Sequence, residues 1–166
     1  IFDNEFVAGN MANMAGVSFR EGNIYPGPVS STAPRVNNAQ AVINCTYIKD
    51  PGMQLVDGNL GVIRPIGYYA APGELITVTV PEALVNKGIK IIAGAHTDQS
   101  SLDGMRRLQR ISKAIDITST ATQIVNPFGG ALYFKIPQEL NEGLQTVTIN
   151  GAVKSPYFRM LSGQPQ

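Results

Sequence analysis

Apolar and polar residues alternate in short runs along most of the chain, and this alternation predicts β-strands. The clearest run places Ile76, Val78 and Val80 on one face of a strand. It places Thr77 and Thr79 on the opposite face. A period of two is typical of a strand that is buried on one side. The pattern predicts strands at residues 41–48, 60–69, 75–80, 89–95, 115–120, 122–125, 131–136, 146–149 and 153–158.

Turn-forming sequences separate the predicted strands, which recur about every ten residues. Glycine and proline favour such turns because they adopt backbone angles that other residues adopt only at a cost. The arrangement predicts an all-β fold, a β-sandwich, and leaves a jelly-roll and an immunoglobulin-like topology both open. The turn sequences are DPG at 50–52, APGE at 71–74, NPFGG at 126–130, NEG at 141–143 and NG at 150–151.

Helical structure is expected only in one or two short stretches. Residues 81–85 fit a single helical turn that begins with proline. Residues 102–111 fit a short helix, which Gly104 weakens.

The first 23 residues have no clean period. Four apolar side chains there are spaced as on a short helix: Phe6, Val7, Met11 and Met14. We interpret residues 1–23 as a lead-in or linker segment that packs on the core. The proline-rich stretch 24–36 is extended rather than helical. We therefore expect the β-sandwich domain to cover residues 24–166.

Composition and charge exclude two classes of partner. Of the 166 residues, 15% are charged, against about 25% in an average soluble domain. The 13 basic and 12 acidic residues give a net charge of +1, whereas proteins that bind nucleic acid carry an excess of basic residues. No apolar run approaches the roughly 20 residues of a membrane-spanning helix. We therefore expect neither nucleic acid binding nor membrane insertion.

The chain contains a single cysteine, Cys45, and a single histidine, His96. One cysteine excludes an intrachain disulfide, and one histidine excludes the HExxH motif of zinc peptidases. The alternation places Cys45 on the apolar face of its strand, where we expect it to be buried. Nucleophile-elbow, phosphate-loop and dinucleotide-binding motifs are also missing from the sequence. We therefore predict no catalytic residue in this chain.

Candidate contact residues lie in the one long polar stretch, residues 96–114. His96 and Asp98 follow the apolar run 89–95, so they are expected at the end of a strand. There they would contact a ligand or a neighbouring domain. In the alternative interpretation, His96 only hydrogen-bonds Asp98 or a backbone carbonyl.

A basic cluster follows in the same stretch and consists of Arg106, Arg107, Arg110 and Lys113. Guanidinium groups bind carboxylate and sulfate well, so the cluster would suit an acidic glycan or an acidic neighbouring domain. A solvated or interdomain face is the alternative. The pattern leaves both open.

Several segments, in this order, resemble one protein family. The sequence is similar to the N-terminal portion of the enhancin-type, mucin-degrading zinc metallopeptidases of peptidase family M60. The resemblance covers about residues 24–160. It rests on YPGPVS at 25–30, APRV at 33–36, GYYAAPGE at 67–74, ITVTVP at 76–81, GAHTD at 94–98, RIS at 110–112, NPFGGALY at 126–133, GAV at 151–153 and SPYFR at 155–159.

The resemblance implies a secreted or cell-surface protein, often bacterial, that acts on mucin-type glycoproteins. In such proteins a β-sandwich portion precedes a catalytic domain in which HExxH and a further Glu bind zinc. This chain lacks HExxH, so the resemblance assigns it no catalytic or metal-binding residue, and we expect zinc only in the catalytic domain. The implied partners are that adjacent domain and, through the substrate, mucin-type O-glycans.

These observations predict a non-catalytic β-sandwich segment that supports a peptidase domain and contacts its glycoprotein substrate. A free-standing carbohydrate-binding module is the alternative. The six Tyr residues can stack on sugars, although Trp is absent. An adhesion or interaction module without sugar specificity is a third hypothesis.

Overall fold

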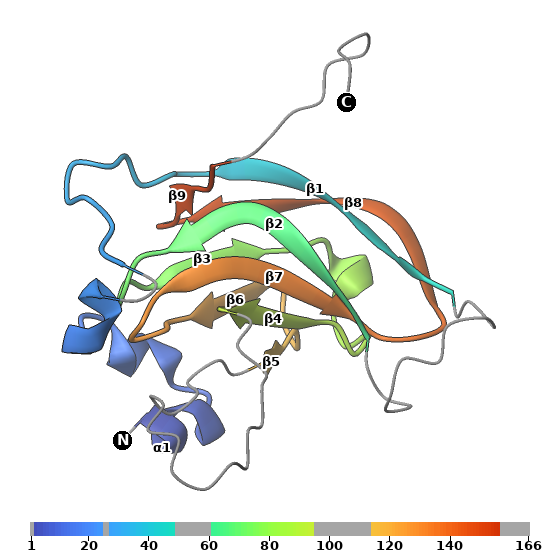
Figure 1. Cartoon of the computed structure of the whole chain (residues 1–166). Helices are drawn as coiled ribbons and strands as arrows, with labels where there is room; N and C mark the ends of the chain where they lie inside the picture. Colours follow the sequence, from blue (N-terminus) through green and yellow to red (C-terminus); the bar gives the residue numbers. More distant parts are fainter. Residues whose placement is uncertain (1, 25–26, 49–60, 95–113, 157–166) are drawn as a thin grey trace, which may run out of the picture.

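The computed structural model describes residues 2–24, 27–48, 61–94 and 114–156. Within these ranges nine strands form two antiparallel sheets that lie face to face (Figure 1). The predicted all-β class and β-sandwich are therefore confirmed. The strands are β1 (Ala39–Tyr47), β2 (Val62–Ala70), β3 (Ile76–Thr79), β4 (Lys90–Ala93), β5 (Ala114–Asp116), β6 (Ala121–Ile124), β7 (Gly130–Ile136), β8 (Leu140–Asn150) and β9 (Val153–Lys154).

The strand order shows that neighbours in the sheets are mostly distant in the sequence. The four-stranded sheet has the order β1-β8-β3-β6, and the five-stranded sheet has the order β5-β4-β7-β2-β9. Consecutive strands β1 and β2 lie in different sheets, as do β3 and β4. The chain therefore crosses repeatedly between the two layers, which ties the sheets together at both ends.

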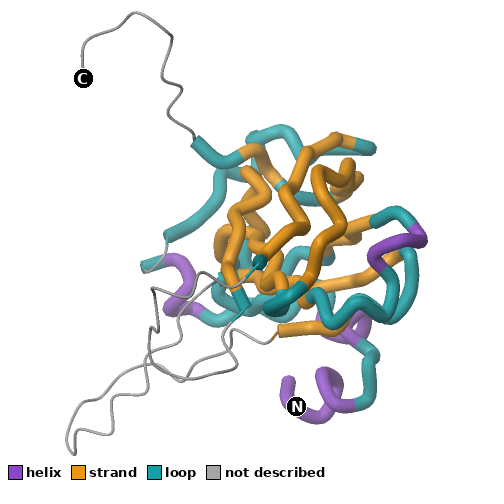
Figure 2. Tube along the Cα trace, turned by 90° about the vertical axis from the view of Figure 1, so that its right-hand side faces the viewer, coloured by secondary structure: helices purple, strands orange, loops and turns teal. Residues whose placement is uncertain are grey.

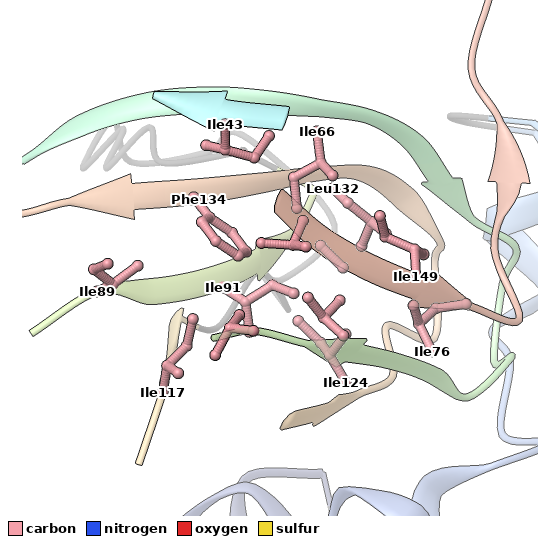
Figure 3. Packing of buried hydrophobic residues seen from close by; sticks show 14 of the residues in the cluster. Ile43, Ile66, Ile76, Ile89, Ile91, Ile117, Ile124, Leu132, Phe134 and Ile149 are labelled. Carbon is pink, nitrogen blue, oxygen red and sulfur yellow. The ribbon is translucent and has the colours of Figure 1, made fainter. Parts of the chain in front are cut away.

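Alternating side chains of both sheets fill the space between them (Figure 3). In β7 the residues Leu132, Phe134 and Ile136 are fully buried, and the residues between them are only partly buried. In β3 the side chains of Ile76 and Val78 are fully buried, as the alternation predicts. Burying a side chain of this size stabilises a fold by about 1.5–3 kcal/mol.

Cys45 is part of this core, as predicted, and no part of its side chain reaches solvent. Its strand, β1, lies at the edge of the four-stranded sheet. Arg64 of β2 donates a hydrogen bond from Nη2 to the carbonyl oxygen of Thr46 at 2.9 Å, so the five-stranded sheet closes part of this edge. Burial raises the pKa of the Cys45 thiol to about 11, and the positive charge of Arg64 only partly opposes that shift.

The prediction of a turn at residues 141–143 is wrong, because β8 runs through this sequence from Leu140 to Asn150. Gly143 has φ of +67°, and the pairing register with β1 shifts opposite it, between Asn44 and Thr46. The hydroxyl oxygen of Thr46 accepts the Gly143 N–H at 2.9 Å. The irregular sequence thus becomes a bulge inside a strand pair, since a cross-strand hydroxyl satisfies its backbone.

The N-terminal segment forms three short helices that lie outside the two layers of strands (Figure 2). They are α1 (Phe2–Val7) and the 3₁₀ helices η1 (Met11–Met14) and η2 (Arg20–Asn23). Met11 and Met14 are buried against Val125, beside Leu75. A boundary at residue 24 stays a prediction. The predicted turn at 81–85 is the 3₁₀ helix η3 (Glu82–Leu84), whereas the helix predicted at 102–111 lies outside the described residues.

Phe134→Ala is expected to lower the free energy of unfolding by about 3–5 kcal/mol, because it leaves a cavity among fully buried side chains. Chemical denaturation followed by circular dichroism measures the change. Ile63→Ala is the matched control, since the Ile63 side chain lies at the surface with 40% of its area exposed. Equal losses for the two variants would contradict this description of the core.

The thiol of Cys45 is expected to react with a thiol reagent far more slowly in the native protein than in the unfolded protein. With a pKa of about 11, roughly one thiol in a thousand is ionised at pH 8. Burial slows the reaction further. Reaction kinetics with and without denaturant measure the difference. Equal rates in the two states would show that the thiol is exposed.

Candidate functional site

All five residues that the sequence singles out for contact lie outside the described residues, so their roles stay predictions: His96, Asp98, Arg106, Arg107 and Arg110. The structure does describe where this part of the chain begins and ends. The segment follows Gly94 at the end of β4 and precedes Ala114 at the start of β5. β4 and β5 are paired, with Ile92 opposite Ala114. Both ends of the segment are therefore held at one end of the five-stranded sheet.

That end of the sandwich is organised by the buried side chain of Asn126, which is 3% exposed. Its Nδ2 donates to the carbonyl oxygen of Ala93 at 2.7 Å, and its Oδ1 accepts the N–H of Phe128 at 2.9 Å. Its own carbonyl oxygen accepts the N–H groups of Gly73 and Gly129, each at 2.9 Å. One residue thus joins the end of β4, the turn after β2 and the turn between β6 and β7. We call this group of contacts the Asn126 junction.

Two glycines let the backbones approach at the Asn126 junction. Gly129 has φ of +70°, and a Cβ there would lie 2.7 Å from the carbonyl oxygen of Ala70. Gly130 has φ of +149°, and its Cβ would lie 2.5 Å from the Cα of Gly94. Any side chain at these positions would push the strands apart. The Gly-Gly pair is therefore a packing requirement at the point where the chain leaves β4.

The N-terminal segment closes the outer side of the same junction. The N–H of Phe19 donates to the carbonyl oxygen of Pro127 at 3.0 Å, and the N–H of Gly16 donates to the carbonyl oxygen of Gly73 at 2.8 Å. The rings of Phe19 and Phe128 lie with their centroids 5.0 Å apart. These contacts connect the first 23 residues to the turns of the β-sandwich.

An ion pair fixes the stretch that leads into β1. Arg35 donates from Nε and Nη2 to the two carboxylate oxygens of Glu74, at 2.8 and 2.5 Å. Its Nη1 donates to the carbonyl oxygens of Ser30 and Ala33. The hydrogen bonds to Glu74 raise the pKa of the Arg35 guanidinium. Two of the quoted sequence segments, 33–36 and 67–74, therefore contact each other in the fold.

Two further features of the described residues concern metal binding and membrane crossing. No group of three or more His, Cys, Asp or Glu side chains gathers among these residues in a way that could hold a metal ion. No helix in the described ranges is long and apolar enough to cross a membrane. The hydrogen bonds of the Asn126 junction position backbone segments of three connections.

Asn126 does not stand out in the sequence, because NPFGG at 126–130 has the residue types of an ordinary strand connection. The signal was present in that an Asn between an apolar strand and a Pro is well placed to bond backbone groups two residues on. Its second bond, to Ala93, joins residues that are 33 positions apart. Local sequence cannot predict such a contact.

Residues 32–150 match the model of a protein family described as the N-terminal domain of M60-like peptidases. The chain belongs to this family. The match covers well over half of the chain and includes β1 to β8, together with Arg35 and Asn126. The resemblance drawn from the sequence segments is thereby confirmed.

Curated relatives include vertebrate proteins. The chain is 34% identical to TRPM8 channel-associated factor 3 of Rattus norvegicus over 95 residues, and 33% identical to TRPM8 channel-associated factor 1 of Homo sapiens over 97 residues. Each match covers 57% of this chain and 10% of the relative. The chain therefore spans about a tenth of the length of these relatives.

The fold is also found in a solved enzyme. The chain superposes on the IMPa metallopeptidase from Pseudomonas aeruginosa with a TM-score of 0.61 and 21% sequence identity. The superposition covers 99% of this chain and 18% of the metallopeptidase. A structure of IMPa in complex with T-antigen matches with a TM-score of 0.52, 17% identity and coverage of 91% and 16% of the two chains. At these identities the similarity establishes a shared fold.

Asn126→Ala is expected to lower the free energy of unfolding by about 2–4 kcal/mol, because the carbonyl of Ala93 and the N–H of Phe128 lose their buried partner. Thermal and chemical denaturation measure the change. Asn13→Ala is the matched control, because Asn13 makes an exposed hydrogen bond to Glu5. A loss at Asn126 no larger than the loss at Asn13 would contradict a central role for the junction.

Proposed function

We propose that this chain is the non-catalytic N-terminal β-sandwich of a zinc metallopeptidase that acts on glycoproteins. Its membership in the family of N-terminal domains of M60-like peptidases carries the proposal. The shared fold with IMPa supports it, since IMPa structures include complexes with an O-glycopeptide and with T-antigen. In this proposal the parent protein cleaves mucin-type glycoproteins. The β-sandwich positions the peptidase domain and the substrate but takes no part in bond cleavage.

The proposed role of the β-sandwich is to support the peptidase domain and contact the glycoprotein substrate. The Asn126 junction suits a support, because buried backbone hydrogen bonds and tight glycine contacts resist deformation. A rigid unit beside a cleft keeps one wall of that cleft in place without a large entropy loss on substrate binding. Zinc would be bound by the HExxH motif of the adjacent catalytic domain. A secreted or cell-surface location is part of the same proposal, since mucin-type glycoproteins are extracellular.

A second candidate function comes from the names of the relatives with 33–34% identity, which are channel-associated factors. In this alternative the chain is an interaction domain in a protein that associates with a membrane channel. The two candidates differ in what the rest of the polypeptide contains. A zinc metallopeptidase of the proposed type requires an HExxH motif, whereas an interaction protein does not.

We expect the parent protein, but not the isolated chain, to bind zinc and to have peptidase activity. The chain of 166 residues should bind no stoichiometric zinc in equilibrium dialysis and should not cleave an O-glycopeptide. The native polypeptide, extended beyond Gln166 and sequenced from its source, should contain HExxH, bind one zinc and cleave the same glycopeptide. Its HExxH Glu→Gln variant is the control for contaminating peptidase activity.

Two results would overturn the proposal. One tightly bound zinc per isolated chain would place a metal site in the β-sandwich itself. A native polypeptide without HExxH would remove the peptidase function and favour the interaction domain. Mass spectrometry of the native protein gives the second answer directly.

A further inference from the structure

The two sheets differ sharply in charge. The four strands β1, β3, β6 and β8 contain one charged residue, Glu142, and its carboxylate forms an ion pair with Lys87 at 2.8 Å. Each strand of the five-stranded sheet carries a charged residue: Arg64, Lys90, Asp116, Lys135 and Lys154. A protein surface is ordinarily about 25–35% charged. The outer face of the four-stranded sheet is therefore unusually neutral.

Hydroxyl and amide side chains recur on that outer face, and the exposed apolar side chains of Val42 and Leu144 lie on it near β1. The register sets Thr77 of β3 opposite Gln123 of β6 and Asn150 of β8. It also sets Thr148 of β8 between Thr79 of β3 and Gln40 of β1. Each of these side chains points away from the core, because the neighbouring positions in the strands face inward. We call this surface the neutral face.

A groove lies where the neutral face meets the N-terminal segment. It is an open depression of about 320 Å³. Its lining comes from the N-terminal segment (Phe6, Gly9 and Met11), from β3 and β6 (Thr77, Ala121, Thr122 and Gln123) and from β5 and the chain that leads on to β6 (Ile115, Asp116, Thr118 and Ser119). Met11 packs with Val125 beside Leu75. Leu75 precedes Thr77 along β3 and Val125 follows Gln123 along the antiparallel β6, so both lie at one end of the same outer face. The part of the sheet that the N-terminal segment covers thus ends where the neutral face begins.

The groove lining carries no unpaired charge among the described residues, and it offers both hydrogen-bond donors and hydrogen-bond acceptors. Threonine and glutamine offer both donors and acceptors, and Ser119 accepts in addition to its bond to the carbonyl oxygen of Ala121. Phe6 offers an aromatic ring. The one carboxylate in the lining is Asp116, and Lys90 binds both of its oxygens, at 2.8 and 2.9 Å. The described lining contains no Lys or Arg side chain.

A saccharide without charge has the complementary properties. Its hydroxyl groups pair with side chains that both donate and accept, and its C–H faces pack on aromatic and aliphatic walls. A volume near the lower end of ligand sites suits one or two sugar rings. A sialylated or sulfated glycan would find no Lys or Arg side chain in the lining to pair with its charge, so the charge gains it nothing here.

We propose that this groove binds a neutral saccharide, a hexose or N-acetylhexosamine at the end of an uncharged glycan. The inference rests on the proposed function, because the groove would supply the contact between the β-sandwich and its glycoprotein substrate. Thr77 and Gln123 hold the sugar hydroxyls, and Phe6 packs on its ring. The neutral face beyond Thr79 leaves an open path along which further uncharged sugars or a glycosylated peptide extends.

Titration of the chain with the T-antigen disaccharide, followed by two-dimensional NMR of the backbone amides, tests the inference. We expect shift changes at residues 77, 119 and 123 and little effect of added salt, because the ligand carries no charge. The double variant Thr77→Val, Gln123→Leu should weaken binding about tenfold or more. Thr146→Val is the matched control, since it removes a hydroxyl from the same outer face near β1, away from the groove.

The outcomes separate cleanly. Absence of shift changes at millimolar disaccharide overturns the inference, as do changes confined to residues 95–113 or binding that is tighter for the sialylated disaccharide. If the double variant does not fold, Phe6→Leu alone should weaken binding while Val7→Leu, at a site with 83% exposure, should not. A parent protein that still cleaves glycopeptide while the chain binds no sugar retains the proposed function and loses only this groove.

Discussion

Backbone groups at the open end of a β-sandwich need hydrogen-bond partners, and in this chain one buried amide provides them. Strand ladders satisfy the middle of each sheet, but the turns at the end have no ladder to join. Asn126 supplies a donor and an acceptor from its side chain and a carbonyl that binds two further N–H groups. Replacing this set would require several independent contacts. The approach of β4, β7 and the N-terminal segment therefore depends on it.

The pattern of alternation carried enough information for the fold because nearly all of the core is built from strands with one buried face. Strands β3 and β7 follow the alternation residue by residue. Prediction failed where cross-strand chemistry decides the backbone, as at Gly143, whose N–H bonds to Thr46. It failed in the same way at Asn126, whose partner Ala93 lies in another strand. Both contacts form only after distant segments meet.

For the candidate site, too, the sequence predicts local features but not those that depend on contacts between distant segments. Residue types indicated a glycan or interdomain contact, since the single histidine His96 and basic residues such as Arg106 are conspicuous in a sequence of low charge. A surface defined by missing charge is much harder to see. Thr77, Gln123 and Asn150 are ordinary residues one by one, and only the sheet register brings them to one outer face. The sequence shows on which face of its own strand each residue lies, but it does not show which strands are neighbours.

The two regions are joined by the chain itself. The polar stretch that carries His96 and Arg106 is followed directly by β5 and by Ile115, which lines the groove. The same stretch follows Gly94, whose backbone is held against Gly130 at the Asn126 junction. One side of the molecule thus combines a rigid anchor, a neutral groove and the ends of a charged segment. The described groove lining contains no Lys or Arg side chain, so the proposed sugar contact there depends on hydroxyl and amide groups rather than on charge.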